Sequence, residues 1–335
     1  MKEVAEAPED GKPKVIQAQA GALIEQFNKP PTTWQIDLSV YGMESNCAGI
    51  KFGRLEFLTD LVKSPISVPG YIDSGVDLEV FFARVSVEAI NEKAAVERAT
   101  ETVERHLAVL NALCSQSIPS RTRLSHPAEQ LRRFVVSRTK GPWDPEALAA
   151  FGFSNYGAVL LSRIDCEAFL NQRGGAFVSK LLQQRTSFAN RILAGYEIAG
   201  GACIEQRYHM SFLLFAIALE SVVLGKQNKS EITYQLSSRI AHLLATDVPS
   251  RRNLSKTVNS LYSLRSTIVH AGESEVAERE LGSFRNICLS ALFALSTLPA
   301  FEDMKSVEEL EQWFNDRMLG AIDEVPENSP SDSTT

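Results

Sequence analysis

Hydrophobic and polar residues alternate in the first third of the chain. The segment 34–40, Trp-Gln-Ile-Asp-Leu-Ser-Val, shows this period of two most clearly and predicts a half-buried strand. Segment 50–57 is expected to form a strand with a bulge or bend at Gly53, and segment 75–90 one or two more. After Asn91, which suits a helix N-cap, apolar residues recur every three to four positions. We therefore predict a small antiparallel sheet with a helix over about 92–115 packed on it.

The second half of the chain shows helical periodicity throughout. Its most apolar stretch, Met210–Leu224, is hydrophobic almost all round, which predicts the buried central helix of a bundle. A preceding helix is expected to carry the apolar residues of 178–196 and to end at Gly200–Gly201. Four more helices are predicted: one with Ser230 as its N-cap, one through Leu254 and Ile268 that ends near Gly272, one through Leu281 and Leu295 that Pro299 stops, and a shorter amphipathic one at about 306–320.

These patterns predict an α+β fold class and divide the chain into five parts. Residues 1–30 are expected to be a partly disordered leader, 31–116 an α+β domain, and 117–157 a loop-rich junction. A short helix is expected within the junction at about 128–138. A helix at 158–171 then opens an all-α bundle that extends to residue 320, and the acidic tail 321–335 is expected to be disordered.

The composition, with 44% hydrophobic and 22% charged residues, indicates a soluble globular protein. Its net charge of -7 argues against nonspecific coating of nucleic acid, because phosphate binding needs a surplus of Lys and Arg. The charge is uneven, however: residues 226–265 contain seven basic and two acidic residues, whereas 302–327 contain nine acidic and two basic ones. Five scattered cysteines without a CxxC pair indicate buried or free thiols. Together with the lack of a signal core or membrane-spanning run, they predict a cytoplasmic protein.

Candidate chemistry narrows to polar groups in the helical half. The sequence has no GxGxxG, GxxxxGK[ST], GxSxG or HExxH motif and no His/Cys cluster with metal-ligand spacing, so neither a cofactor nor a metal is predicted. Arg265 and His270, near the end of a helix, combine a fixed cation with a side chain that can move a proton near neutral pH. RNA phosphodiester transfer needs both, for proton transfer and for the charge that grows on the phosphoryl oxygens.

The spacing of Arg265 and His270 is a weak signal when taken alone. Arg121 and His126 repeat it in a Pro-flanked loop. A surface arginine followed by a histidine that the helix dipole favours would also look the same. Five helical residues rotate by about 500°, which leaves the two side chains about 140° apart. Either the helix loosens near Gly272 or a second copy completes the site.

Other polar residues of the helical half have structural explanations. Glu220 lies inside the most hydrophobic helix, so its carboxylate must be paired or hydrogen-bonded. Arg239 is expected to be its partner in a buried ion pair that sets the register of two helices. The alternative is that Glu220 orients Arg265 or Arg239 beside the site. The remaining histidines are expected to lie on the surface (His106) or to be structural (His209 and His242).

Three segments on consecutive predicted helices resemble the Apea-like branch of the HEPN superfamily. They are 218–221, 229–241 and 261–272, within residues 205–298. The resemblance implies a dimerising helical bundle in which the R-x4-6-H motifs of two copies form one metal-independent endoribonuclease site. Carried onto this chain, it implies that His270 transfers protons, that Arg265 stabilises the phosphoryl group, and that the products are a 2′,3′-cyclic phosphate and a 5′-hydroxyl. Glu220, Arg239 and Tyr262 then fall at supporting positions.

This sequence departs from the family at Ser266, where many active members have Asn, Asp or His after the motif arginine. The predicted function is an HEPN-type ribonuclease in defence against phage or other invading elements, with RNA and a second copy of the chain as partners and no membrane contact. The alternative is a non-catalytic helical module that binds RNA, a nucleotide or a partner protein. The predicted RNA contacts are the basic residues around the motif: Lys226, Lys229, Arg251, Arg252 and Lys256.

Overall fold

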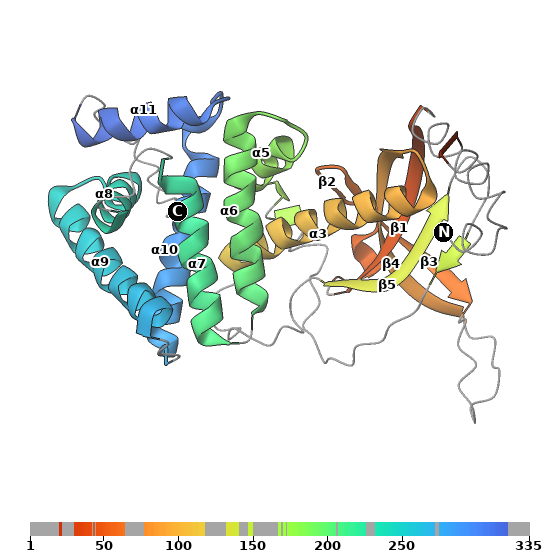
Figure 1. The fold of residues 1–335 in the computed structure, drawn as a ribbon, viewed down its shortest axis with the longest axis horizontal. Coiled ribbons are helices and arrows are strands. Elements are labelled where there is room, and N and C mark those ends of the chain that lie inside the picture. The colour runs from red at the N-terminus through yellow and green to blue at the C-terminus, as the bar shows by residue number, and fades with distance from the viewer. Residues whose placement is uncertain are drawn as a thin grey trace, which may run out of the picture.

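Figure 1 shows the computed structural model of the protein, in which a sheet with one long helix is followed by a group of packed helices. The described residues are 20–21, 30–41, 43, 45–63, 77–117, 132–140, 147–149, 167–168, 170–171, 173–205, 207–225, 232–271 and 275–320. This arrangement confirms the predicted α+β class. The predicted acidic tail and most of the leader and of the junction lie outside these residues, so the division into domains stays a prediction.

An antiparallel sheet occupies the N-terminal part, with strand order β2-β3-β4-β1-β5-β6. Trp34 on β1 stands opposite Val87 on β4, and Ile36 opposite Val85, so these side chains pack on a shared face. Ile36 and Leu38 are fully buried, which confirms the strand predicted at 34–40. The strands are β1 (Thr32–Tyr41), β2 (Lys51–Phe52), β3 (Leu55–Lys63), β4 (Asp77–Ala89), β5 (Arg132–Lys140) and β6 (Ala147–Ala149), with a short 3-10 turn at Ser45–Cys47.

Two expectations for this region need correction. Segment 50–57 belongs to two strands, β2 and β3, because Gly53, at φ +58°, makes a tight turn between them instead of a bend within one strand. Strand β5 lies where the sequence predicts a short helix at 128–138. There, β1 offers a partner edge, with Ile36 opposite Thr139, and the β-branched residues of β5 suit a strand.

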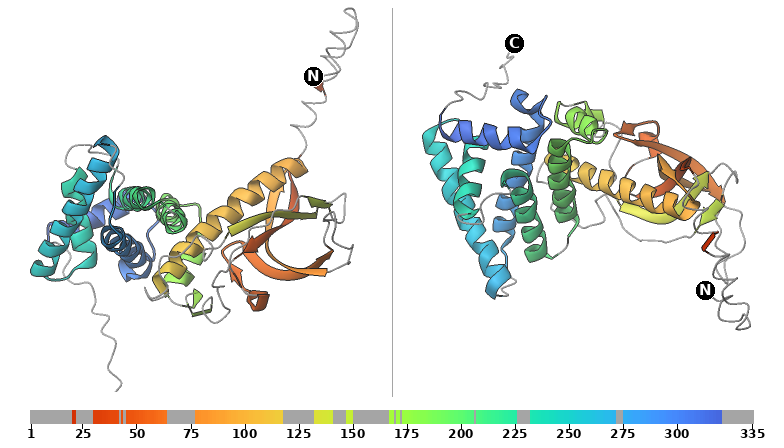
Figure 2. Two further views of the ribbon diagram at one scale, coloured as in Figure 1. Left: turned by 90° about the horizontal axis from the view of Figure 1, so that it is seen from below. Right: turned by 45° about the horizontal axis from the view of Figure 1, so that its top comes forward.

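Helix α3 (Glu92–Ser117) connects the sheet to the helical half, as Figures 1 and 2 show. Asn91 caps it as predicted, because its side-chain oxygen accepts the backbone N–H of Ala94 at 2.8 Å. The helix packs against β4 and β1 of the sheet and also against α6 (Ser187–Ile204). The buried residues of the sheet and of the helices form one continuous hydrophobic core.

His106 on α3 is only 3% exposed, which makes the predicted surface position wrong. Its Nδ1 lies 2.6 Å from the carbonyl oxygen of Thr102, and its Nε2 accepts the backbone N–H of Arg54 at 3.2 Å. Burial lowers the pKa of His106 from 6.5 to about 4, so the ring is neutral. The turn between β2 and β3 covers the side of α3 that carries His106. Ser179 holds this turn, because its Oγ accepts the backbone N–H of Gly53 at 3.0 Å.

The helix predicted over 178–196 is interrupted. Helix α5 (Arg173–Leu181) ends within this segment, and five residues separate it from the start of α6 at Ser187. The side chain of Thr186 caps α6 by accepting the backbone N–H of Ala189 at 3.1 Å. The apolar periodicity continues across the break between α5 and α6, and Thr186 is the main local signal of this break. The sequence pattern therefore predicts one helix where the structure has two.

The glycine pair Gly200–Gly201 does not end α6, which continues to Ile204. Gly200 serves helix packing instead. A Cβ atom at this position would lie 1.8 Å from the carbonyl oxygen of Ala108 on α3, whereas one at Gly201 would have no atom within 4 Å. The close approach of α3 and α6 therefore requires glycine at position 200.

The remaining helices confirm the predicted bundle elements after residue 207. Ser306 caps the last one by accepting the backbone N–H of Glu309 at 3.2 Å, whereas the predicted cap Ser230 lies outside the described residues. The cysteines Cys47, Cys114, Cys203 and Cys288 are buried thiols, as predicted, and Cys166 lies outside the described ranges. The helices are α7 (Tyr208–Val223), α8 (Ile232–Leu244), α9 (Val248–Ala271), α10 (Glu278–Thr297) and α11 (Val307–Met318), with a 3-10 turn at Pro299–Phe301.

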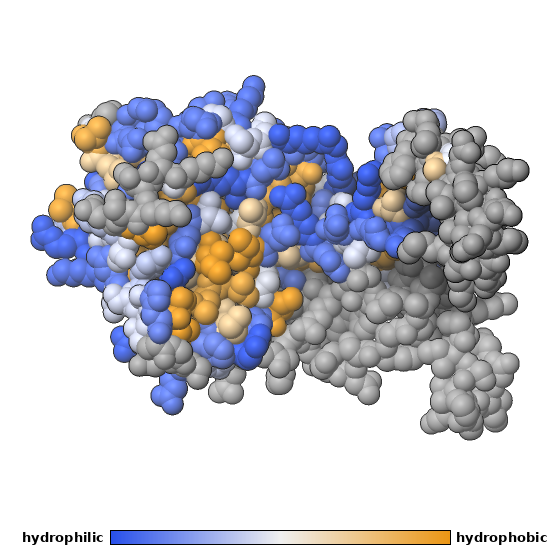
Figure 3. Space-filling model, in the orientation of Figure 1, coloured by the Kyte–Doolittle hydropathy of each residue, from blue (hydrophilic) through white to orange (hydrophobic). Residues whose placement is uncertain are grey.

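Helix α7 is buried on one side only, although its sequence predicts burial all round. It packs against α6 and α10, and Phe212, Phe215 and Leu219 are buried in the core. Another face reaches the surface, where Ile217 is 43% exposed. Figure 3 shows a group of hydrophobic residues at the surface over this helix. We call the apolar residues of this face the α7 stripe: Met210, Leu213, Leu214 and Ile217.

Candidate functional site

Helix α9 is continuous from Val248 to Ala271 and carries both Arg265 and His270. Asp247 precedes the helix and caps it, because its Oδ1 accepts the backbone N–H of Ser250 at 2.8 Å. The buried side of the helix follows the predicted apolar periodicity and includes Val258, Leu261 and Ile268. Packing on this side fixes the directions in which the polar residues of α9 point.

Arg265 lies in a cluster with Tyr262 of the same helix and Glu220 of α7. The Nε atom of Arg265 is 3.3 Å from Oε1 of Glu220, and the hydroxyl of Tyr262 donates a hydrogen bond to the same oxygen at 2.9 Å. The guanidinium carbon also lies 5.5 Å from the centre of the Tyr262 ring, within cation–π range. One carboxylate oxygen therefore holds two side chains that are neighbours on α9.

The contact between Arg265 and Glu220 is an ion pair without hydrogen-bond geometry. Nε of Arg265 has no hydrogen-bond partner among the described residues, although it lies within ion-pair distance of the carboxylate. Both side chains are 24% exposed, so solvent weakens the attraction but does not remove it. The carboxylate thus anchors the guanidinium through charge and not through an aligned pair of hydrogen bonds.

Tyr262 remains protonated at physiological pH. Burial, followed by the hydrogen bond to Glu220 and the charge of that carboxylate, raises the pKa of Tyr262 from 10 to about 12, and the positive charge of Arg265 opposes this shift. A phenol with such a pKa is a poor general base near neutral pH. Tyr262 therefore holds Glu220 in place, which agrees with a supporting position.

His270 is exposed near the end of α9, and the helix does not bring it to Arg265. Because α9 stays helical through Ala271, the two side chains point about 140° apart. Of the two alternatives, loosening of the helix does not occur within its described part, and Gly272 lies beyond that part. Ser266, which follows the motif arginine, is also exposed. A single copy therefore presents Arg265 and His270 on different sides of α9.

Arg239 pairs with Glu311 of α11, so the predicted ion pair between Glu220 and Arg239 is wrong. Nη1 of Arg239 lies 2.7 Å from Oε2 of Glu311 and donates to the carbonyl oxygen of Val223 at 2.7 Å. Its guanidinium also lies over the ring of Phe314, 5.2 Å from the centre. Helix α8 places Arg239 at the end of α7, where the last carbonyls lack intrahelical partners, while Glu220 one turn earlier faces α9.

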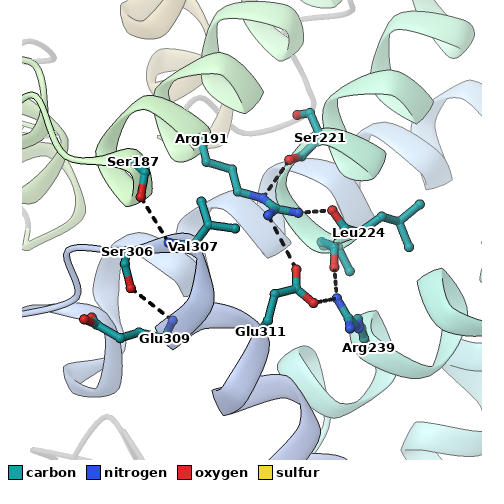
Figure 4. A network of polar contacts seen from close by, with 10 residues as sticks. Ser187, Arg191, Ser221, Leu224, Arg239, Ser306, Val307, Glu309 and Glu311 are labelled. Carbon is teal, nitrogen blue, oxygen red and sulfur yellow. Dashed lines mark hydrogen bonds and ion pairs between the residues drawn. The ribbon is translucent and has the colours of Figure 1, made fainter. Parts of the chain in front are cut away.

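Arg191 and Glu311 support the site and were not predicted from the sequence. Figure 4 shows Glu311 between two arginines, with Nη1 of Arg191 3.4 Å from its Oε1. Arg191 also donates from Nε to the carbonyl oxygen of Ser221 at 3.0 Å and from Nη2 to that of Leu224. The arginine thereby fixes the end of the helix that presents Glu220. Charged residues on amphipathic helices resemble ordinary surface residues in a sequence, so neither position carries a signal.

The predicted RNA-contact residues have different surroundings. Arg251 donates from Nε to the carbonyl oxygen of Ala245 at 3.0 Å, so it caps the end of α8. Arg252 and Lys256 are exposed on α9, and no ion pair joins either one to another residue in the described ranges. Two further candidates lie outside those ranges: Lys226 and Lys229. Arg252 and Lys256 are therefore the candidates that the structure leaves open to an anion.

In the described ranges, no group of three His, Cys, Asp or Glu side chains gathers where it could hold a metal ion. Every helix in the same ranges is too short or too polar to traverse a lipid bilayer. Comparisons with protein-family models, curated proteins and solved structures find no match to this chain. A functional proposal therefore depends on the geometry around α9 and on the sequence resemblance.

Proposed function

We propose that this chain is a metal-independent endoribonuclease of the HEPN type. The observation that supports it best is the arrangement on α9, where Glu220 and Tyr262 anchor Arg265 and His270 stands exposed on the same helix. An anchored cation and an accessible imidazole are the two groups that RNA phosphodiester transfer needs. The three segments that resemble the Apea-like HEPN proteins support the same reaction, and a role in defence against invading elements rests on that resemblance alone.

In the proposed reaction, the 2′-oxygen of a ribose attacks the adjacent phosphorus. A new oxygen–phosphorus bond forms, and the bond to the 5′-oxygen of the next nucleotide breaks. His270 takes the proton of the 2′-hydroxyl, and a protonated His270 of the second copy gives one to the leaving oxygen. Arg265 stabilises the negative charge on the non-bridging oxygens. No water is consumed, so the products are a 2′,3′-cyclic phosphate and a 5′-hydroxyl.

The proposed active unit is a homodimer through the helical half. Because Arg265 and His270 point about 140° apart within one chain, a second copy has to supply the missing group at each site. The α7 stripe offers a surface for this contact, since it is apolar and partly exposed (Figure 3). Glu220 lies on the same helix, one turn beyond the stripe, so a contact there would place the partner beside the Arg265 cluster.

The test is to incubate the purified protein with end-labelled RNA in excess EDTA, beside the variants Arg265→Ala, His270→Ala and Lys93→Ala. Lys93 is the control, because its side chain is 87% exposed on α3. We expect cleavage in EDTA that each site variant lowers by about a hundredfold or more and that the control leaves unchanged. Cleavage that survives either site substitution would sink the proposed site.

One observation favours a second candidate, a non-catalytic module that binds RNA, a nucleotide or a partner protein. Arg265 is already engaged by Glu220, and Ser266 stands where many active HEPN members carry Asn, Asp or His. In this candidate, α9 binds its ligand without cutting it. RNA that is bound but left intact in the same experiment would favour the module over the enzyme.

A further inference from the structure

The pair of helices α8 and α9 is depleted in acidic residues. Residues 232–271 contain one acid, Asp247, in a chain of net charge -7. At the average frequency of the chain, a segment of this length would contain about five. Asp247 itself is used to cap α9 through Ser250. The pair lies at one end of the molecule, in both views of Figure 2 as in Figure 1.

Three of the five Lys and Arg side chains of this pair are engaged within the protein. Arg239 and Arg265 form ion pairs with glutamates, and Arg251 donates to a backbone carbonyl at the end of α8. Arg252 and Lys256 are the other two. Both are exposed on α9, and neither has an ionic partner in the described part of the chain. Within this pair of helices, the side chains of Lys and Arg that have no partner among the described residues therefore both lie on α9.

Five exposed polar residues of α9 share one face of the helix, whereas Ser250, Asn253, Thr257 and Ser260 are exposed on other sides. Arg252 and His270 are separated by five full turns, so they lie at the same angle around the axis. Lys256, Ser263 and Ser266 lie within about 40° of that direction. All five side chains are exposed, and they form a line about 27 Å long, which we call the α9 face.

We propose that the α9 face binds the phosphate backbone of single-stranded RNA along the helix. Arg252, Lys256, Ser266 and His270 can each donate to a phosphate oxygen, whereas the hydroxyl of Ser263 donates to the carbonyl oxygen of Asn259 at 2.9 Å. Arg252 and Lys256 are permanent cations without a counter-ion in the described part of the chain, so the face complements a polyanion. Its length corresponds to about eight stacked nucleotides. The face carries no Phe, Tyr or Trp, and His270 at one end is its single ring, so we expect the binding to depend on the backbone and not on the sequence.

This inference takes RNA as the partner from the proposed function but needs none of its chemistry. The strand would pass His270 at one end and Arg252 at the other, on the side of α9 that faces away from Arg265. Binding along the α9 face can therefore hold even if the chain cleaves nothing. A probe that cannot be cleaved separates the two proposals.

The experiment measures binding of a fluorescent 2′-O-methyl oligoribonucleotide of about 20 nucleotides by anisotropy, with the full chain. Its blocked 2′-oxygens prevent the proposed cleavage. For the wild type we expect the logarithm of the association constant to fall with the logarithm of salt concentration at a slope of about -1.4, from two contacts of about 0.7 each. The double variant Arg252→Gln/Lys256→Gln should lose about tenfold or more in affinity and most of this slope. The exposed control Lys93→Gln should bind as the wild type does.

The outcomes separate cleanly because these side chains are exposed and their replacement leaves the helix intact, which circular dichroism checks. Binding that is weakened in the double variant but not in the control Lys93→Gln supports the α9 face as the RNA-binding surface. If the wild type does not bind, or the double variant binds equally well, the inference is overturned. An acidic peptide that binds where the oligonucleotide does not would also overturn it, in favour of a protein partner. Binding as expected without cleavage of ordinary RNA leaves this inference standing and rejects only the enzyme.

Discussion

Replacing Glu220 with glutamine removes the charge that anchors Arg265 and nearly preserves the shape of the side chain. In the native protein, one oxygen of Glu220 lies 3.3 Å from Nε of Arg265 and 2.9 Å from the hydroxyl of Tyr262. After the substitution, a partly buried guanidinium loses its counter-ion, and Tyr262 donates to a neutral amide oxygen. Both changes destabilise the packing of α9 against α7.

The burial of the pair sets the size of the effect. Removing one partner of a fully buried ion pair costs about 3–5 kcal/mol, whereas exposed pairs contribute about 0–1 kcal/mol. Glu220 and Arg265 are each 24% exposed, so their pair falls between these limits, at about 1–2 kcal/mol. The weaker hydrogen bond of Tyr262 adds about 0.5–1 kcal/mol. We expect Glu220→Gln to lower the free energy of unfolding by about 1.5–3 kcal/mol in total.

A double-mutant cycle measured by urea unfolding isolates the ion pair. The cycle compares the wild type, Glu220→Gln, Arg265→Met and the double variant, with an expected coupling energy of about 1–2 kcal/mol. Lys51 and Glu56 are the matched control, because they lie 3.9 Å apart with side chains 74% and 45% exposed and should couple by less than about 0.5 kcal/mol. If Glu220 and Arg265 couple no more strongly than this control, Glu220 does not anchor the arginine.

Gly200→Ala is expected to lower the free energy of unfolding by about 2 kcal/mol, because its Cβ would meet the carbonyl oxygen of Ala108 at 1.8 Å. Gly201→Ala, at a position with open space around it, should raise the free energy of unfolding by up to about 1 kcal/mol. Equal effects of the two substitutions in urea unfolding would contradict the close packing of α6 on α3 at Gly200. Burial lowers the pKa of His106 from 6.5 to about 4, so between these pH values the unfolded chain binds more protons than the folded one. The free energy of unfolding therefore falls as the pH drops from 6.5 to 4, by up to about 3 kcal/mol. His106→Gln should lack this part of the pH dependence in urea unfolding at pH values near 7 and 4.5, and an unchanged dependence would speak against it. Ile217→Glu on the α7 stripe should convert a dimer to a monomer in light scattering, and a monomeric wild type would count against the proposed dimer.

Periodicity predicts elements of this fold where one side of an element is buried and the other is not. Strand β1 and helix α9 are found as predicted for this reason. Prediction fails where a distant segment decides the outcome. Strand β5 is a strand because it pairs with β1, about a hundred residues away in sequence. His106 is buried because the turn at Gly53–Arg54 covers it, and no local pattern contains that contact.

The candidate site was predicted in part. The three residues Glu220, Tyr262 and Arg265 were singled out from the sequence, and the structure places them in contact. Which arginine pairs with Glu220 depends on where α8 and α9 cross α7. These crossing positions cannot be predicted from the local sequence pattern. Arg239 meets α7 at the carbonyl of Val223, past Glu220, and so pairs elsewhere. Exposure of the α7 stripe was missed for a related reason, since an all-apolar helix predicts burial on every side.

The most direct measurement of the proposed activity is the chemical identity of the RNA ends formed in EDTA by the wild type and by His270→Ala. We predict 2′,3′-cyclic phosphate and 5′-hydroxyl ends with the wild type and only background ends with His270→Ala, whose exposed position makes the substitution structurally harmless. Ends that carry a 5′-phosphate, or the same ends from His270→Ala as from the wild type, would contradict the assignment of α9 as a ribonuclease centre.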